Sequence, residues 1–266
     1  MSKLLIVRRD ATRRNRNVGT AAQGHGRNNR LTIPGIFLSE RRWEELVGST
    51  VQEMLLVHGH SLQVITEELT PGYFHCCDAG MLRRVLELFP IEDLDGLGAI
   101  LLRQPTRKQV TLEPAWGRLT YFANVGKGKE QPLYGGPLVT LEAQEVGRSF
   151  VWSKSLGPNG QRELDRMRGD GHSIEDDGRR YRITPSIESV RSTQLMRTLP
   201  HEIGHWVDYL QKVERPGRGD LEVWQSLQAR YFQRPTVERE KFAHRYADEF
   251  RKTNAEVLRA IVAEPG

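Results

Sequence analysis

Apolar and polar positions divide the chain into a strand-rich part and a helix-rich part. Between residues 53 and 187, short runs rich in Val, Ile, Leu and aromatic residues are separated by turns that contain Gly or Pro, a pattern typical of strands. Beyond Ser189, apolar residues recur at helical spacing, which indicates helices. Strands followed by helices predict an α+β fold.

The strand-rich part also contains two predicted helices. Ser39 is a candidate N-cap for a helix with Trp43, Leu46 and Val47 at helical spacing, and Asp78 is one for a helix over residues 78–89. The predicted strands cover residues 53–77 with breaks at Gly59 and at Pro71 and Gly72, then 108–114, 117–125, 137–155 and 181–187, and a polar loop covers 156–180.

The helix-rich part contains a proline whose effect the sequence leaves open. Three helices are predicted. The first carries LPHEIGHWVDYLQK, residues 199–212, and ends before Pro216. The second covers 220–233 with Asp220 as its N-cap, and the third covers 237–262. Pro200 lies at the start of the first of these helices. The helix either begins near Thr198, which puts the proline in its first turn, or begins upstream and kinks at the proline.

Positive charge is concentrated at the N-terminus. Residues 1–42 hold ten Lys or Arg and two acids, a net charge of +8, and since the whole chain carries +5 the remainder carries −3. Residues 8–30 are mostly Arg, Asn, Gly and Gln, which cannot bury enough apolar surface to offset the entropy of ordering. We predict a basic, disordered tail over 1–34. It is either a solvated terminus, which we favour because no aromatic residues interleave the arginines, or an arm for nucleic acid or another anionic partner.

The sequence also indicates the cellular compartment of the protein. No apolar run approaches the roughly 18 residues that span a bilayer, and the run Leu4–Val7 is too short for the core of a signal peptide. Cys76 and Cys77 are adjacent and are not expected to form a disulfide. We expect a cytoplasmic protein with no membrane contact, or alternatively one delivered by a secretion route that needs no signal peptide.

Residues 201–205 read HEIGH, and this spacing has a specific chemical consequence. Residues four apart on a helix stack on one face, so His201 and His205 can direct two imidazole nitrogens at one Zn²⁺ ion. Glu202 lies beside them, where its carboxylate can take a proton from a water molecule that the metal activates. We predict one Zn²⁺ per chain, with Glu202 as the general base. Gly204 disfavours a helix by roughly 1 kcal/mol, which makes sense if another backbone packs closely against it.

A catalytic zinc takes a third protein ligand and keeps one position open. The helix over 237–262 carries an apolar stripe, made of Ala243, Tyr246, Ala247 and Phe250. Glu240 lies on the same stripe, and an ionised carboxylate on a buried face is costly unless it is paired or bound to metal. Glu240 is therefore the predicted third ligand, with His244 and Asp208 as alternatives. Asp208 could instead accept a hydrogen bond from the second ring nitrogen of His205.

Amide cleavage also benefits from a hydrogen-bond donor aimed at the developing oxyanion. Tyr231, Tyr246 and His244 are candidates near the metal-binding helices. We favour Tyr231, because it lies on the segment that connects these helices, nine residues before Glu240, where its side chain can reach over the metal.

HEIGHWVD followed by EKFAHRYADEFR resembles the zinc site of the gluzincin peptidases, in particular the family of the anthrax lethal factor catalytic domain. The similarity covers about residues 182–251, and the matching positions are His201, Glu202, His205, Asp208, Glu240, Phe242 and Ala243. Members of that family place a catalytic Tyr shortly before the ligand Glu, and the spacing from Tyr231 is slightly longer.

The resemblance implies a zincin-like metallopeptidase domain over 111–266, with a mixed sheet and an active-site helix that bears the HExxH motif. A small α/β region of unknown role, 35–110, would precede it. The family also implies an edge strand that pairs with an extended peptide substrate. Residues 179–187 are the natural candidate, because Pro185 suits an edge strand.

The expected function is a zinc-dependent endopeptidase that hydrolyses peptide bonds in a protein substrate. The alternative is a regulatory or binding protein that keeps the zincin fold and binds a partner or nucleic acid through its N-terminal region, although the intact Glu202 argues against a dead enzyme. A structural zinc site is a third interpretation, and it would need Asp208 as the fourth ligand.

Overall fold

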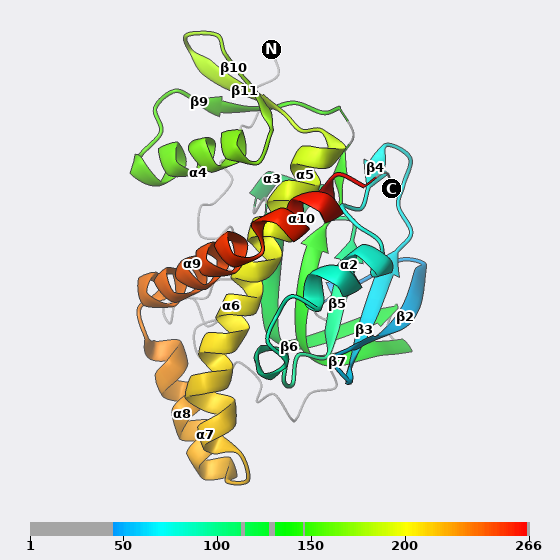
Figure 1. Ribbon diagram of the computed structural model, residues 1–266, viewed down its shortest axis with the longest axis vertical. Coiled ribbons are helices and arrows are strands. Elements are labelled where there is room, and N and C mark those ends of the chain that lie inside the picture. The colour runs from blue at the N-terminus through cyan, green and yellow to red at the C-terminus, as the bar shows by residue number, and fades with distance from the viewer. Residues whose placement is uncertain (1–44, 113–114, 128–130, 146, 265–266) are drawn as a thin grey trace, which may run out of the picture. The chain divides into compact units, whose positions relative to one another are not determined.

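A mixed sheet forms the centre of the fold in the computed structural model, which describes residues 45–112, 115–127, 131–145 and 147–264 (Figure 1). Its strands, in spatial order, are β1 (Glu45–Leu46), β6 (Gly117–Lys127), β7 (Gln131–Glu142), β5 (Ala99–Arg103), β3 (His60–Glu67) and β2 (Thr50–Val57). β5 pairs in parallel with β3 and with β7, whereas β2 with β3 and β6 with β7 are antiparallel pairs. The fold is of the mixed α+β class, as the order of the patterns predicted.

The first hairpin and the first helix after it match the sequence prediction. β2 and β3 are joined by His58 and Gly59, whose φ angles of 51° and 83° are both positive, and such a two-residue turn matches the twist of an antiparallel pair. α2 (Ala79–Leu86) begins after Asp78, whose side chain accepts a hydrogen bond from the backbone N–H of Met81.

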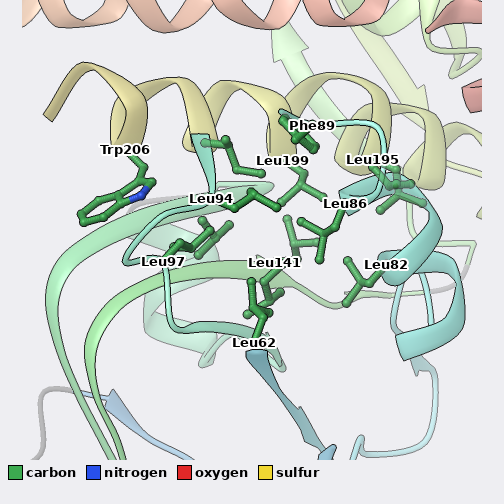
Figure 2. Packing of buried hydrophobic residues seen from close by; sticks show 14 of the residues in the cluster. Leu62, Leu82, Leu86, Phe89, Leu94, Leu97, Leu141, Leu195, Leu199 and Trp206 are labelled. Atoms are coloured by element: carbon green, nitrogen blue, oxygen red, sulfur yellow. The ribbon is translucent and has the colours of Figure 1, made fainter. Parts of the chain in front are cut away.

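One long helical stretch packs against the sheet and carries the histidine motif. It runs without interruption through α5 (Ile187–Thr193), η3 (Gln194–Thr198), α6 (Leu199–Tyr209), η4 (Leu210–Glu214) and α7 (Arg215–Gly217). Figure 2 shows Leu195, Leu199 and Trp206 of this stretch pointing toward leucines that include Leu62 of β3 and Leu141 of β7. Burial of apolar surface, worth roughly 25 cal/mol per Å², therefore fixes the motif helix on the sheet.

The long helical stretch contains two π-helical turns, η3 and η4, and each lies just before a proline. In η3 the N–H of Leu199 bonds to the carbonyl of Gln194, five residues back, and Pro200 follows at once. η4 makes the same π-type turn before Pro216. A proline lacks the N–H and its ring crowds a regular helix, and the wider turn accommodates it. The helix thus begins upstream at Ile187, and the predicted helix end before Pro216 is wrong.

A small lobe over residues 150–184 contains β9 (Phe150–Ser153), α4 (Pro158–Gly169), β10 (Ser173–Asp176) and β11 (Arg180–Thr184), and Figure 1 shows it at one end of the long helical stretch. Leu164, Met167 and Ile183 form its core. The polar loop predicted over 156–180 is therefore wrong. A proline at the first helical position and two apolar residues three apart were the signals for a helix there.

The strand predicted over 181–187 exists as β11, but its expected place at a sheet edge is wrong. β11 pairs with β9 on one side and with β10 on the other, and Pro185 lies just after its last residue. β6 has the more open edge. β1 pairs with it at Val125 and Gly126, and within the described residues no strand lies beside the segment 117–124 on that side.

Two further predictions gave the wrong type of element. Residues 108–114 lie largely in helix α3 (Arg107–Leu112) rather than in a strand. Thr106 and Gln109 form a capping box at its N-terminus, because each side chain accepts a hydrogen bond from the other residue's backbone N–H. The helix predicted after Ser39 is a strand, β1, in its described part.

The C-terminal helices follow the prediction more closely. α8 (Leu221–Gln233) begins after Asp220, whose side chain accepts hydrogen bonds from the N–H groups of Glu222 and Val223. The single helix predicted over 237–262 is divided at Asn254 into α9 (Thr236–Thr253) and α10 (Ala255–Val262).

The predicted domain boundary at residue 110 falls inside one compact unit, Trp43–Gly266. Strands from the region 35–110 and from the region 111–266 share the central sheet, and their buried residues share one core. The basic tail predicted over 1–34 lies outside the described residues. In the part of the chain that the structure describes, no helix is both long and apolar enough to cross a lipid bilayer. Cys76 and Cys77 are buried free thiols.

A buried histidine connects the lobe to the long helical stretch. His172 lies between two hydroxyl groups of α5, with Nε2 2.8 Å from Thr193 Oγ1 and Nδ1 3.1 Å from Ser189 Oγ. Thr193 donates its own hydroxyl hydrogen to Asp170 at 2.9 Å, so its oxygen can accept a hydrogen bond from Nε2. Burial lowers the pKa of His172 below its ordinary value of 6.5, against the opposing charge of Asp170.

This burial makes stability depend on pH with a definite sign. Below pH 6.5 the unfolded chain binds a proton at His172 that the folded protein does not, so stability falls as the pH drops from 6.5 toward the lowered folded pKa. We expect the urea midpoint to fall less between pH 7 and pH 5 in His172→Gln than in the wild type. Urea unfolding followed by circular dichroism at both pH values measures this difference, and equal falls would contradict it.

Candidate metal centre

The motif helix α6 and the later helix α9 meet at a glycine. A Cβ placed on Gly204 would lie 3.1 Å from Ala243 Cα and 3.2 Å from Ala243 O, closer than ordinary van der Waals contact. The close backbone packing predicted from Gly204 is confirmed. It brings Glu240, one turn before Ala243, to the side of α6 that carries the histidines.

His201, His205 and Glu240 form a group that could hold a metal ion, and their ligand atoms all lie within 4.8 Å of one another. His201 Nε2 is 3.3 Å from one oxygen of Glu240, and His205 Nε2 is 3.4 Å from the other. The structure thus brings together the three residues that the sequence predicted as ligands.

Both contacts are longer than a typical charge-assisted hydrogen bond. Charge-assisted N–H···O bonds are about 2.7–2.9 Å long, shorter than either contact. Two ligand atoms that lie about 2.0–2.1 Å from one tetrahedral centre are about 3.3 Å apart. Each histidine nitrogen lies at about that distance from a Glu240 oxygen, His201 from Oε2 and His205 from Oε1. Two imidazole nitrogens and one carboxylate are also a donor set that zinc accepts in sites with an open position.

Glu240 is the most exposed of the three, with 43% of its side chain accessible against 15% for His201 and 13% for His205. The apolar stripe of α9 is buried at Ala243, Ala247 and Phe250, so Glu240 lies at the edge of the stripe and not in the core, contrary to the prediction. The nearby imidazoles of His201 and then His205 hold the pKa of Glu240 well below its ordinary value. The carboxylate is therefore ionised at neutral pH, the form that binds metal.

Glu202 connects the motif helix to β6. Its Oε2 accepts a hydrogen bond of 2.7 Å from the backbone N–H of Leu119. Burial raises the pKa of Glu202, while His201 and His205 oppose that shift. A fixed carboxylate with a raised pKa is suited to taking and returning a proton near neutral pH. The sequence could not predict that Leu119 binds Glu202, because the donor is a backbone N–H, which nearly every residue type has.

Tyr231, the favoured oxyanion donor, is buried in an aromatic cluster at the end of α8. Its hydroxyl lies 3.2 Å from the Tyr121 hydroxyl of β6, and its ring packs edge-on against Tyr209 and Phe232. Tyr121 follows Leu119 by two residues, roughly 6.6 Å along a strand, so Tyr231 lies near the strand segment that holds Glu202. Burial raises the pKa of Tyr231, so its hydroxyl remains a donor at every working pH.

The two alternative donors have different surroundings. Tyr246 donates its hydroxyl hydrogen to Asp93 at 2.7 Å and is thereby committed to the core. The His244 ring centroid lies 4.5 Å from that of His201, and burial, followed by the charge of His201, lowers the pKa of His244. His244, His201 and Glu202 together line a cavity of about 160 Å³, which we call the metal-side cavity.

Asp208 is fully buried and already paired. One carboxylate oxygen accepts a hydrogen bond of 2.9 Å from Arg234, and the other accepts one from Lys212. Asp208 does not belong to the group of metal-ligating residues, and among the described residues it has no hydrogen bond to His205. The structure therefore supports neither of the roles that the sequence left open for it.

Comparisons of the chain with protein-family models, with curated proteins and with solved structures find no match.

Gly204→Ala is expected to weaken zinc binding on the order of tenfold, because a methyl group would push the α9 backbone, and Glu240 with it, away from the histidines. The free energy of unfolding should fall by about 0–2 kcal/mol, since overpacking that costs about 1–3 kcal/mol is partly offset by a helix-propensity gain of about 1 kcal/mol. Gly169→Ala, where a Cβ would meet nothing within 4 Å, is the matched control. Titration with zinc against a chromogenic chelator measures the effect, and unchanged affinity would show that this contact does not position Glu240.

Proposed function

We propose that this chain is a zinc-dependent endopeptidase of the gluzincin type, with a zincin-like fold, that hydrolyses peptide bonds in a protein substrate. The meeting of His201, His205 and Glu240 beside a half-buried Glu202, held by the Leu119 N–H, carries the proposal. His201, His205 and Glu240 would hold one zinc ion per chain. Bound zinc supplies Lewis-acid chemistry, which lowers the pKa of a water molecule and polarises a carbonyl group.

Glu202 performs the proton transfers. Its Oε2 is held by the N–H of Leu119, so Oε1 is the atom that takes a proton from water and delivers it to the departing amine nitrogen. The raised pKa of Glu202 brings its proton affinity nearer to neutral pH, where one group can both accept and return a proton.

Tyr231 is the proposed donor to the developing oxyanion. In the protein without substrate its hydroxyl is shared with Tyr121, and catalytic hydrogen bonds often form only in the substrate complex. Tyr246 is less suited, because its hydroxyl is bonded to Asp93. A donor of this kind typically contributes about 10²–10³-fold to the rate.

A peptide substrate would dock along the edge of β6, in place of the strand 179–187 that the sequence suggested. The segment 117–124 has no strand beside it on that side within the described residues, and an extended peptide can add to such an edge through main-chain hydrogen bonds. Leu119 lies in this segment and holds Glu202. A peptide paired there would therefore run past the general base.

A purely structural zinc site is the competing interpretation, and it requires a fourth protein ligand. Asp208, the residue that would have to supply it, is paired with Lys212 and Arg234. Within the described residues the metal-ligating group contains His201, His205 and Glu240, and three protein ligands are typical of a catalytic site. This favours the enzymatic interpretation.

Zinc content and peptide cleavage test the proposal. We expect the purified protein to contain about one zinc ion per chain by elemental mass spectrometry, as three protein ligands predict, and to cut members of a mixed peptide library. Removing the metal with 1,10-phenanthroline should abolish cleavage, and returning zinc should restore it. Protein that binds no zinc, or cleavage that survives removal of the metal, would defeat the proposal.

A further inference from the structure

A second and larger cavity, of about 590 Å³, lies between the lobe and the central sheet. We call it the lobe cavity. Its walls come from β9 and α4 of the lobe, from the start of β6 and from the end of β7, and its apolar lining includes Trp116, Ala143, Phe150, Val151, Trp152 and Met167. A volume above about 300 Å³ with mainly apolar walls is typical of a ligand site.

The lobe cavity is adjacent to the metal-side cavity. Trp116 and Glu163 line both it and the metal-side cavity, which His201 and Glu202 also line. Trp116 is fixed in place, because its carbonyl accepts hydrogen bonds from the Glu142 N–H at 3.1 Å and from Gln194 at 2.6 Å. A peptide that lies on β6 beside Glu202 would therefore have this cavity next to it.

Charge pairing around the lobe cavity determines the kind of side chain that it can take. The charged residues of its lining form ion pairs within the chain, namely Arg118 with Glu142 at 2.7 Å, Arg148 with Glu145 at 2.5 Å, and Glu163 with Arg197 at 2.7 Å. A charged ligand group would have to compete with these pairs and would lose its own hydration. The indole rings, Phe150 and Met167 instead offer apolar surface, whose removal from water favours an uncharged group.

We propose that the lobe cavity is a specificity subsite that takes a bulky apolar side chain of the peptide substrate, aromatic or long aliphatic. The inference rests on the proposed peptidase function for its link to cleavage, but binding to the cavity can be measured without any cleavage.

The binding test uses full-length Glu202→Gln protein with ¹³C-labelled methionine methyl groups, so that nothing is cut. Met167 lines the cavity, whereas Met54 is 65% exposed on β2 and serves as the internal control. N-acetyl-L-phenylalaninamide is expected to shift the Met167 methyl signal in a saturable way and to leave Met54 unchanged. N-acetyl-L-alaninamide and N-acetyl-L-lysinamide should shift neither signal.

The cleavage test compares two matched variants. Val151→Trp places a large ring at the cavity wall, on a strand position that is 44% exposed, and Val51→Trp makes the same change on β2, at a position that is 64% exposed. With a peptide library, the wild type and Val51→Trp should prefer a bulky apolar residue at one fixed position. Val151→Trp should lose that preference, with kcat/KM for such peptides lower by about tenfold or more.

The outcomes separate the subsite from the peptidase activity. If no peptide is cut but the phenylalanine probe shifts Met167, the proposed function fails and the cavity remains a binding site for apolar groups. If peptides are cut but Val151→Trp keeps the wild-type preference, the subsite is refuted. Equal shifts of Met167 with the lysine or alanine probe would also refute it.

Discussion

Glu202→Gln is expected to lower the rate of peptide cleavage by about 10²–10⁴-fold and to leave zinc bound. Glutamine has the shape of glutamate, and its side-chain oxygen can still accept the hydrogen bond from the Leu119 N–H. The amide cannot take a proton from water, so the loss should fall on kcat. Burial raises the pKa of Glu202, which means that its ionised form opposes folding at neutral pH. The urea midpoint of the variant should therefore equal or exceed that of the wild type.

Glu249→Gln is the matched control, because Glu249 lies exposed on α9 and outside the metal-ligating group. Steady-state kinetics on a peptide that the wild type cuts, zinc analysis and urea unfolding give the three readouts. Cleavage by Glu202→Gln within threefold of the wild-type rate would show that another group takes the proton. Loss of zinc from this variant would place Glu202 among the ligands.

Glu240→Gln is expected to weaken zinc binding by more than 100-fold and to abolish cleavage with it. Residues that merely orient a metal ligand change affinity by about 10–100-fold, and loss of a ligand's charge should exceed that range. The Glu240 oxygens lie 3.3 Å and 3.4 Å from the two histidine nitrogens, and a neutral amide is a weaker ligand for Zn²⁺ than a carboxylate. Competition with a chromogenic zinc chelator measures the affinity, and circular dichroism checks that the fold is kept.

His244→Gln tests the assignment of the third ligand independently. His244 lies beside His201 and was the alternative ligand on the same helix, so a zinc site that used it would lose the metal in His244→Gln and keep it in Glu240→Gln. We expect the opposite pattern. Equal retention of zinc by both variants would show that the third ligand comes from another residue.

Several structural features that depend on a few neighbouring residues were predicted from the sequence. The strand break at Gly59 and the helix caps at Asp78 and Asp220 were all predicted and are all present. The strand predicted over 108–114 and the loop predicted over 156–180 were wrong, although local signals for helices were present. These signals were the T-x-x-Q motif that begins at Thr106 and the proline at the first position of α4.

The sequence by itself determined that His201 and His205 lie on one face of a helix with Glu202 beside them, because i and i+4 positions of a helix always lie on the same face. Only the tertiary structure decided which acid completes the group. Glu240 reaches the histidines because Gly204 lets the backbones of α6 and α9 pack within van der Waals distance. Likewise, the pairing of the strands decided that the open edge belongs to β6 and not to β11, and that residues on both sides of position 110 form one unit. Such contacts join residues far apart in the chain. Their free energy comes from burial and strand pairing over the whole fold, and the spacing of neighbouring residues does not predict either.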